Sequence, residues 1–181
     1  MDINALFNSD NKFKSEEEIN NRIRELGDKI TEDFNGKELV VIGVVNGALY
    51  FFSDLSRNIR LPISIDTIGF GNIPDTTSKT GQVKITKDIN IDINGKDVII
   101  VEDVIRTGLT TAYLISKLEE LNPNSIKIAT MLFNPKRLLL SLPIEYVGFE
   151  VGDEWLVGYG LDVNGIGRNI PYISVLQKDK L

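Results

Sequence analysis

The sequence predicts an α/β fold in which a mostly parallel, twisted sheet is flanked by helices. Apolar, β-branched runs occupy residues 39–45 and 98–101, and a further strand is expected at 126–133. Continuous apolar runs are typical of strands buried on both faces. Segments with apolar residues at helical spacing alternate with these runs between positions 39 and 133. This alternation favours parallel strands joined by right-handed crossovers. A chain of 181 residues suits one domain with a single core.

The first helix is predicted from the signal at its N-terminus. Ser15 and Glu18 have the spacing of a capping box, in which each residue satisfies a free backbone N–H group of the other. The apolar residues that follow recur at helical spacing and are Ile19, Ile23, Leu26, Ile30 and Phe34. The helix is expected to end at Asn35-Gly36. The polar residues 1 to about 13 are expected to be loosely held.

The strand at 39–45 stops at Asn46-Gly47, and an apolar helical pattern follows from Leu49 to Leu55. A tight glycine turn at this place is either an ordinary connection or an anion site at a helix N-terminus. A further strand is expected from Ile63 to Ile68. The polar stretch from Gly69 to Gly81 is then either a surface loop or an active-site lid, and residues 83–85 and 89–91 alternate like a short hairpin.

Residues 98–111 combine a buried strand, two acids and a threonine-rich loop. Glu102 and Asp103 are placed where the strand of Val98 to Val101 ends, and Arg106 to Thr111 contains one glycine and three threonines. Ligands of open α/β sheets bind at the carboxyl ends of strands, and N–H groups at a helix N-terminus bind anions. The stretch therefore predicts a carboxylate pair beside a phosphate cradle. The alternative is a pair of solvated acids followed by a threonine-capped helix.

Beyond this stretch, a helical pattern runs from Ala112 to Leu121, and the following strand ends at Asn134-Pro135. The C-terminal part mixes short strands and turns. Trp155 is the only tryptophan, and a lone tryptophan more often belongs to a core or an interface than to a ligand site.

Composition excludes several classes of function. The formal net charge is −6, which opposes binding to nucleic acid, because that binding needs a basic surface. The absence of cysteine and histidine removes thiol chemistry, the usual neutral-pH base and typical zinc sites. A metal should therefore be a hard ion such as Mg²⁺ held by carboxylates. No signal peptide or membrane-length apolar run is present, so we expect a cytoplasmic protein without a membrane partner.

Glu102-Asp103, two apolar residues, one variable position and Thr107-Gly108-Leu109-Thr110 resemble the phosphoribosyl-diphosphate (PRPP) motif of purine phosphoribosyltransferases. Residues 147–150, 157–162 and 168–172 are similar to the hood of the 6-oxopurine members. The resemblance covers roughly residues 15 to 176 and is nearest to the hypoxanthine-guanine phosphoribosyltransferases. It implies the type I phosphoribosyltransferase fold, with a core at about 36–145 and a hood formed by about 1–20 and 146–181 within one domain.

The resemblance also implies an activity and its ligands. A phosphoribosyl group would pass from PRPP to the purine base hypoxanthine or guanine, giving the nucleoside monophosphate IMP or GMP and diphosphate, with Mg²⁺ as cofactor. Metal would lie at Glu102, Asp103 and Asp162. Substrates would contact Val45, Asn46, Gly47, Gly69, Phe70, Thr107, Gly108, Leu109, Thr110, Thr111, Asn134, Trp155, Leu156 and Arg168. Within this set Trp155 would stack on the purine, Leu156 would offer backbone groups to the base edge, and Arg168 would contact diphosphate. A homodimer or homotetramer is implied.

Four positions depart from the pattern of the resembled family. Asn46 stands where a basic residue is usual, Gly69-Phe70 replaces a Ser-Tyr pair, and Asn134 replaces lysine. Arg106 occupies the position of the acid that takes the purine N7 proton, and an arginine cannot act as a general base at physiological pH. General base catalysis is typically worth ~10²–10⁴-fold in rate. Two alternatives therefore stay open, a weakly catalytic PRPP or nucleotide sensor and an enzyme with another base preference.

Overall fold

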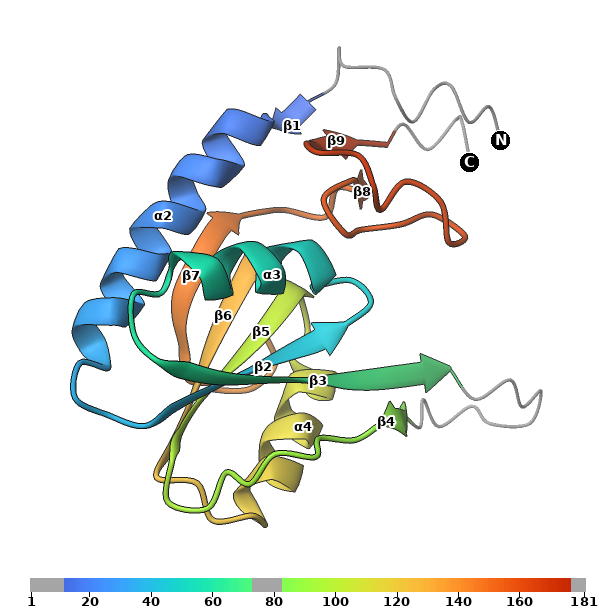
Figure 1. The fold of residues 1–181 in the computed structure, drawn as a ribbon. Coiled ribbons are helices and arrows are strands. Elements are labelled where there is room, and N and C mark those ends of the chain that lie inside the picture. Colours follow the sequence, from blue (N-terminus) through green and yellow to red (C-terminus); the bar gives the residue numbers. More distant parts are fainter. Residues whose placement is uncertain (1–11, 73–82, 177–181) are drawn as a thin grey trace, which may run out of the picture.

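The computed structural model describes residues 12–72 and 83–176, which form two sheets and three helices (Figure 1). The large sheet has the strand order β4-β3-β2-β5-β6-β7, and the small sheet has the order β1-β9-β8. The helices are α2 (Glu16–Asp33), α3 (Leu49–Asn58) and α4 (Leu109–Glu119). The strands are β1 (Lys12–Lys14), β2 (Leu39–Val45), β3 (Ile63–Asn72), β4 (Val83–Lys87), β5 (Asp97–Ile105), β6 (Ser125–Phe133), β7 (Ile144–Glu150), β8 (Leu156–Val157) and β9 (Ile173–Val175).

The large sheet is parallel except at β4, which confirms the predicted fold class. β2 pairs in parallel with both β3 and β5, and β6 joins β5 to β7. The chain moves from β2 to one side of the sheet and later returns to β5 on the other side. The carboxyl ends of β2 and β5 therefore flank the point where the strand order reverses, which is where ligands of such sheets bind.

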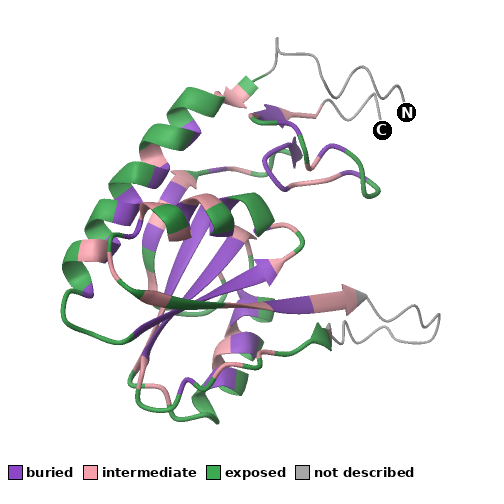
Figure 2. Ribbon diagram, viewed as in Figure 1, coloured by how far each residue is buried: buried purple, intermediate pink, exposed green. Residues whose placement is uncertain are grey.

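Helices cover both faces of the large sheet. Alternate side chains of β2 belong to different clusters, with Val41 on the side of α2 and α3 and with Val40 and Ile42 on the side of α4. Figure 1 shows α2 and α3 on one face and α4 on the other. Most residues of the central strands are buried, whereas the outer faces of the helices are exposed (Figure 2). This double burial explains why the strands read as continuous apolar runs.

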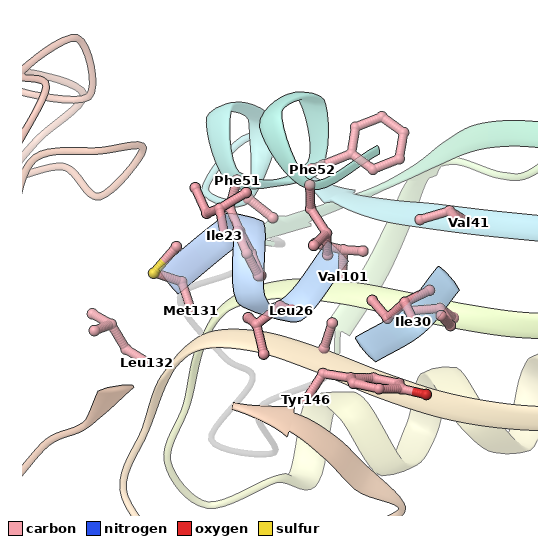
Figure 3. Close-up of a cluster of buried hydrophobic side chains, with 14 of the residues drawn as sticks. Ile23, Leu26, Ile30, Val41, Phe51, Phe52, Val101, Met131, Leu132 and Tyr146 are labelled. Atoms are coloured by element: carbon pink, nitrogen blue, oxygen red, sulfur yellow. The ribbon is translucent and has the colours of Figure 1, made fainter. Parts of the chain in front are cut away.

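The predicted start and packing of the first helix are confirmed. The Ser15 hydroxyl accepts a hydrogen bond from the Glu18 N–H group, and the Glu18 carboxylate accepts one from the Ser15 N–H group. The apolar face of α2 meets α3 and the large sheet in one cluster (Figure 3). Tyr146 of β7 is buried in this cluster and donates its hydroxyl to Asp33 at 2.8 Å.

Several predicted boundaries were wrong. β5 continues to Ile105, so Glu102 and Asp103 lie within the strand rather than after it, because β6 extends alongside and pairs Thr130 with Glu102. β3 continues through Gly69 and Phe70, which were expected in a loop. These residues pair with β4, and Phe70 packs against the cluster on the α4 side.

The predicted hairpin is also corrected. β4 pairs with β3, and residues 89–91 form no strand. The rest of the expected lid, residues 73–81, lies outside the described residues, as do residues 1–11. Residues 12 and 13 belong to β1, which pairs with β9 in the small sheet.

The small sheet joins the two ends of the described chain and lies beyond the end of the large sheet toward which β7 points (Figure 1). Within the described ranges, no helix combines the length and the apolar character needed to cross a membrane.

Candidate active site

Two loops meet where the strand order reverses. β2 ends at Val45, and the Val45–Asn46 peptide bond is cis. Gly47 then lies directly against Asp103 of β5, since a Cβ atom on Gly47 would stand 1.8 Å from Oδ2 of Asp103. Only a residue without a side chain fits between the loop and this carboxylate.

The two acids of β5, Glu102 and Asp103, have little contact with water. Glu102 is buried and accepts a hydrogen bond from the Thr111 hydroxyl at 3.2 Å. Burial, followed by the negative charge of Asp103, raises the pKa of Glu102 to about 8. Burial also raises the pKa of Asp103, with Asp162 adding to the rise and Arg168 opposing it. Such shifts mark acids that gain from a cation or from hydroxyl donors at the site.

The loop between β5 and α4 forms a cavity at the N-terminus of the helix. The cavity measures about 300 Å³ and is lined by residues 102–111. Gly108 is the N-terminal cap residue of α4 with φ +77°, and a Cβ atom there would meet Leu142 at 2.7 Å and Leu138 at 2.9 Å. Thr107 and Thr110 are exposed at this cavity. Free N–H groups and hydroxyls around a cavity of this kind suit an anion.

A turn of the C-terminal part closes against the glycine loop of β2. A Cβ atom on Gly160 would stand 2.0 Å from the carbonyl oxygen of Gly47. Arg168 donates to the Gly160 carbonyl at 2.6 Å and forms an ion pair with Asp162 at 2.6 Å. The structure therefore brings the predicted residues Gly47, Asp162 and Arg168 to one place, beside Asp103.

The two departures nearest the expected base site contact the segment before Trp155. Arg106 donates to the carbonyl oxygens of Gly152 and Glu154 at 3.3 and 2.8 Å. Asn134 is buried and donates to the same Gly152 oxygen at 2.7 Å. Trp155 is 54% exposed, so a large part of its surface is accessible to a ligand.

The remaining predicted residues lie around this centre. Leu156 is buried in β8 and pairs with Val175. Gly69 pairs with Val45 at the end of β2, so β3 flanks the glycine loop. Phe70 packs on the α4 side of the sheet instead. Leu109 is exposed in the first turn of α4.

The acids offer a partial set of metal ligands. In the described ranges, no three acidic side chains are close enough together to hold an ion by themselves. Mg²⁺ usually takes one or two carboxylates and completes its shell with water and substrate oxygens. Glu102 and Asp103, with Asp162 near Asp103, fit that kind of site.

Several residues at the site carry no motif in the sequence. Gly160 backs the glycine loop, Leu138 and Leu142 support Gly108, and Arg137 pairs with Asp153. All these contacts join segments that are distant in the chain, and no local motif marks them. The one available signal was the glycine-rich run at 158–160, which indicated a close backbone approach.

Comparison with known proteins adds independent findings. The family model described as a phosphoribosyl transferase domain matches residues 11–164. A curated hypoxanthine-guanine phosphoribosyltransferase of Staphylococcus aureus (strain Mu50) is 39% identical over 165 residues, which is 91% of this chain and 92% of that protein. A crystal structure of a hypoxanthine-guanine phosphoribosyltransferase from Bacillus anthracis has a TM-score of 0.86 at 40% identity, covering 92% of this chain and 98% of that one. A hypoxanthine phosphoribosyltransferase structure from Staphylococcus aureus has a TM-score of 0.88 at 38% identity, covering 94% and 93%.

Proposed function

This chain belongs to the phosphoribosyltransferase family, and from that premise we propose that it makes IMP or GMP from PRPP and hypoxanthine or guanine, releasing diphosphate. The observation that carries the proposal is the meeting of three segments at the reversal of strand order. These are the glycine loop at Gly47, the acid pair of β5, and the turn that holds Arg168. Purine salvage is the role that this reaction serves.

The 5-phosphate of PRPP would bind in the cavity at the N-terminus of α4. Backbone N–H groups at residues 108–111 and the exposed hydroxyls of Thr107 and Thr110 are its donors. The absence of a Cβ atom at Gly108 leaves the backbone open to the phosphate. Thr111 has a different task, because its hydroxyl already donates to Glu102.

The ribose and the diphosphate would lie between β5 and the glycine loop. Ionised Glu102 and Asp103 would accept the ribose hydroxyls, and Arg168 would pair with diphosphate. Glu102, Asp103 and Asp162 would hold Mg²⁺, whose charge offsets the negative charge that develops on diphosphate. Arg168 and Asp162 are paired with each other at 2.6 Å, so both must exchange partners when substrate binds.

The purine would stack on the exposed side chain of Trp155, which would contribute roughly 1–3 kcal/mol by analogy with base-stacking platforms. A purine nitrogen then forms a bond to C1 of the ribose as the bond to diphosphate breaks. Arg106 is a permanent cation and cannot take the proton that the purine loses. Water is therefore the acceptor that we assign.

Product analysis tests the proposal. The protein is incubated with PRPP, Mg²⁺ and hypoxanthine, and IMP is measured by chromatography. We expect IMP from the parent protein and a loss of roughly 100-fold or more in Asp103→Asn, since a charge near the reacting centre is removed. Asp88→Asn is the matched control, because Asp88, like Asp103, accepts from the next backbone N–H group but lies outside the site. Equal rates in all three proteins, or no nucleotide from hypoxanthine or guanine, would contradict the proposal.

A further inference from the structure

Side chains from the ends of two neighbouring strands converge on residues 152–154, directly before Trp155. Arg106 follows β5 and donates to the carbonyl oxygens of Gly152 and Glu154. Asn134 follows β6 and donates to the Gly152 oxygen at 2.7 Å and to Asp153 Oδ1 at 3.1 Å. Two of the four departures thus share one acceptor, the Gly152 oxygen.

The donors and the acceptor of the Asn134 side-chain amide all have hydrogen-bond partners within the protein. Its nitrogen has two hydrogens, and these account for the bonds to Gly152 and Asp153. Its oxygen accepts from the Lys136 N–H group at 3.1 Å, and the side chain is 1% exposed. A lysine at this place has no acceptor and would leave the Lys136 N–H group without this partner. Asn134 therefore has no amide hydrogen left for a purine.

Arg106 has the geometry to hold two carbonyl groups at once. Its guanidinium is a planar fork of five donors, and two of its nitrogens reach oxygens two residues apart in the chain. A carboxylate at position 106 has no hydrogen to donate to these carbonyls and would repel them. The backbone also links the two strand ends, because the Asn134 N–H group donates to the Ile105 oxygen at 2.9 Å.

Trp155 lies between this network and the small sheet. On one side, Arg106 and Asn134 hold residues 152–154. On the other side, the Trp155 carbonyl accepts from the Leu176 N–H group at 2.7 Å, and Leu156 pairs with Val175. Arg137 adds an exposed bidentate pair with Asp153 at 2.6 and 2.9 Å, which is a weaker support because both groups face water.

We propose that Arg106 and Asn134 are positioning residues that hold residues 152–154 so that the exposed side chain of Trp155 is placed to stack on the base. The inference rests on the proposed function for the identity of the ligand. The network itself belongs to the protein without ligand. Arg106 sets the affinity for the base through the segment and takes no part in proton transfer. It also lies in the lining of the PRPP cavity, but its donors are engaged by the Gly152 and Glu154 carbonyls rather than turned to that cavity.

The test uses Arg106→Met, which keeps an unbranched side chain as long as the stem of arginine and removes the guanidinium donors. Trp155 is the only tryptophan, so the fluorescence anisotropy of the full chain reports directly on this segment. We expect lower anisotropy and a KM for the base raised roughly 10-fold or more, the size of effect typical of lost charged hydrogen bonds. The KM for PRPP should stay within about twofold. Arg106→Lys, which keeps one charged donor, should lie between the parent and Arg106→Met.

Lys136→Met is the matched control, since it removes a neighbouring exposed cation and keeps the backbone N–H group that Asn134 uses. We expect it to match the parent in both measurements. Asn134→Ala is the second variant and should lower the anisotropy as Arg106→Met does.

Two results would overturn the inference. The first is an Arg106→Met protein with parental anisotropy and parental KM for the base, or with both KM values raised alike. The second is faster hypoxanthine turnover in Arg106→Asp, because that gain would mean that position 106 lacks only a base. If the parent forms no nucleotide, the proposed function fails, whereas the anisotropy of the ligand-free variants still decides the positioning role.

Discussion

At the scale of single residues, the site depends on what stands beside the two acids of β5. Gly47 leaves room for Asp103, and Thr111 gives Glu102 its one hydrogen bond from a side chain among the described residues. Neither acid faces enough water to keep its ordinary pKa. Their environment favours the neutral forms until a cation or a substrate hydroxyl arrives.

Gly47→Ala tests the contact between the glycine loop and β5. The new Cβ atom would stand 1.8 Å from Asp103 Oδ2, so the carboxylate or the loop must move. We expect PRPP affinity to fall at least roughly 10-fold, because a displacement of this size misplaces substrate. Calorimetric titration with PRPP and Mg²⁺ measures it. Unchanged affinity would show that the loop and Asp103 do not act together on the ligand.

The raised pKa of Glu102 predicts a dependence of stability on pH. Its folded value of about 8 exceeds its ordinary value of 4.5, so the fold favours the protonated form. The stability that Glu102 contributes is complete below pH 4.5 and is lost as the pH rises to about 8. Between pH 5 and 8, without Mg²⁺ or PRPP, the free energy of unfolding should therefore fall more in the parent than in Glu102→Gln.

Denaturant titrations at several pH values measure this difference. Glu119→Gln, at an exposed glutamate of α4, is the control and should keep the slope of the parent. Asp103 titrates in the same direction in all three proteins, and its interaction with Glu102 is part of the difference that the comparison measures. Asp66, whose pKa is lowered to about 2, acts only below this window. Parallel curves for the parent and Glu102→Gln would contradict the prediction.

At the scale of elements, the loop between β5 and α4 packs against the segment that follows β6. Leu138 and Leu142 contact Gly108, and the Leu139 N–H group donates to the Thr107 carbonyl. The phosphate cavity is therefore shaped by residues about thirty positions later in the chain, as well as by its own motif.

Leu142→Ala should loosen this support. We expect the KM for PRPP to rise roughly 3- to 10-fold. The truncation leaves a cavity next to the loop, so that the N–H groups of the loop are held less firmly in position. The KM for the base should change less. Leu140→Ala, in the same segment but with its side chain 43% exposed, is the control. Steady-state kinetics with each substrate varied in turn measures both, and equal KM values for PRPP in the parent and Leu142→Ala would count against the support.

The elements also show how far the sequence could predict the fold and the site. Runs such as 39–45 were predictable because burial on both faces leaves a continuous apolar signal. The motif at 102–111 was predictable because its chemistry is local. Gly69 to Asn72 read as a loop, since their pairing with β4 is a tertiary effect that composition does not carry. The hydrogen-bond partners of Arg106 lie 46 and 48 positions away in the sequence, and no local pattern of residues predicts such contacts.

At the scale of the whole molecule, one reversal of strand order brings the parts of the site together. β2 and β5 lie side by side, and the small sheet and its connections reach back to Gly47 through Gly160 and to Arg106 through Gly152. Ligand binding should therefore stabilise both the large sheet and the C-terminal part.

Thermal denaturation tests this coupling. A ligand bound only by the folded protein stabilises it by about 2.7 kcal/mol at one hundred times its Kd. We expect PRPP with Mg²⁺ to raise the Tm clearly, and Mg²⁺ alone to raise it little, since the described residues offer no cluster of three acids. Asp103→Asn should lose most of the rise and Asp88→Asn should keep it. A rise of the same size in both variants would place PRPP elsewhere.

The central claim is that this site transfers phosphoribosyl groups to a 6-oxopurine with Arg106 in place of an acid. The most direct measurement is a steady-state assay of diphosphate release with PRPP and Mg²⁺ against hypoxanthine, guanine, xanthine and adenine. We expect turnover with hypoxanthine or guanine. The absence of diphosphate release with all four bases, together with PRPP binding by calorimetry, would contradict the central claim. It would indicate a protein that binds PRPP without transferring its phosphoribosyl group.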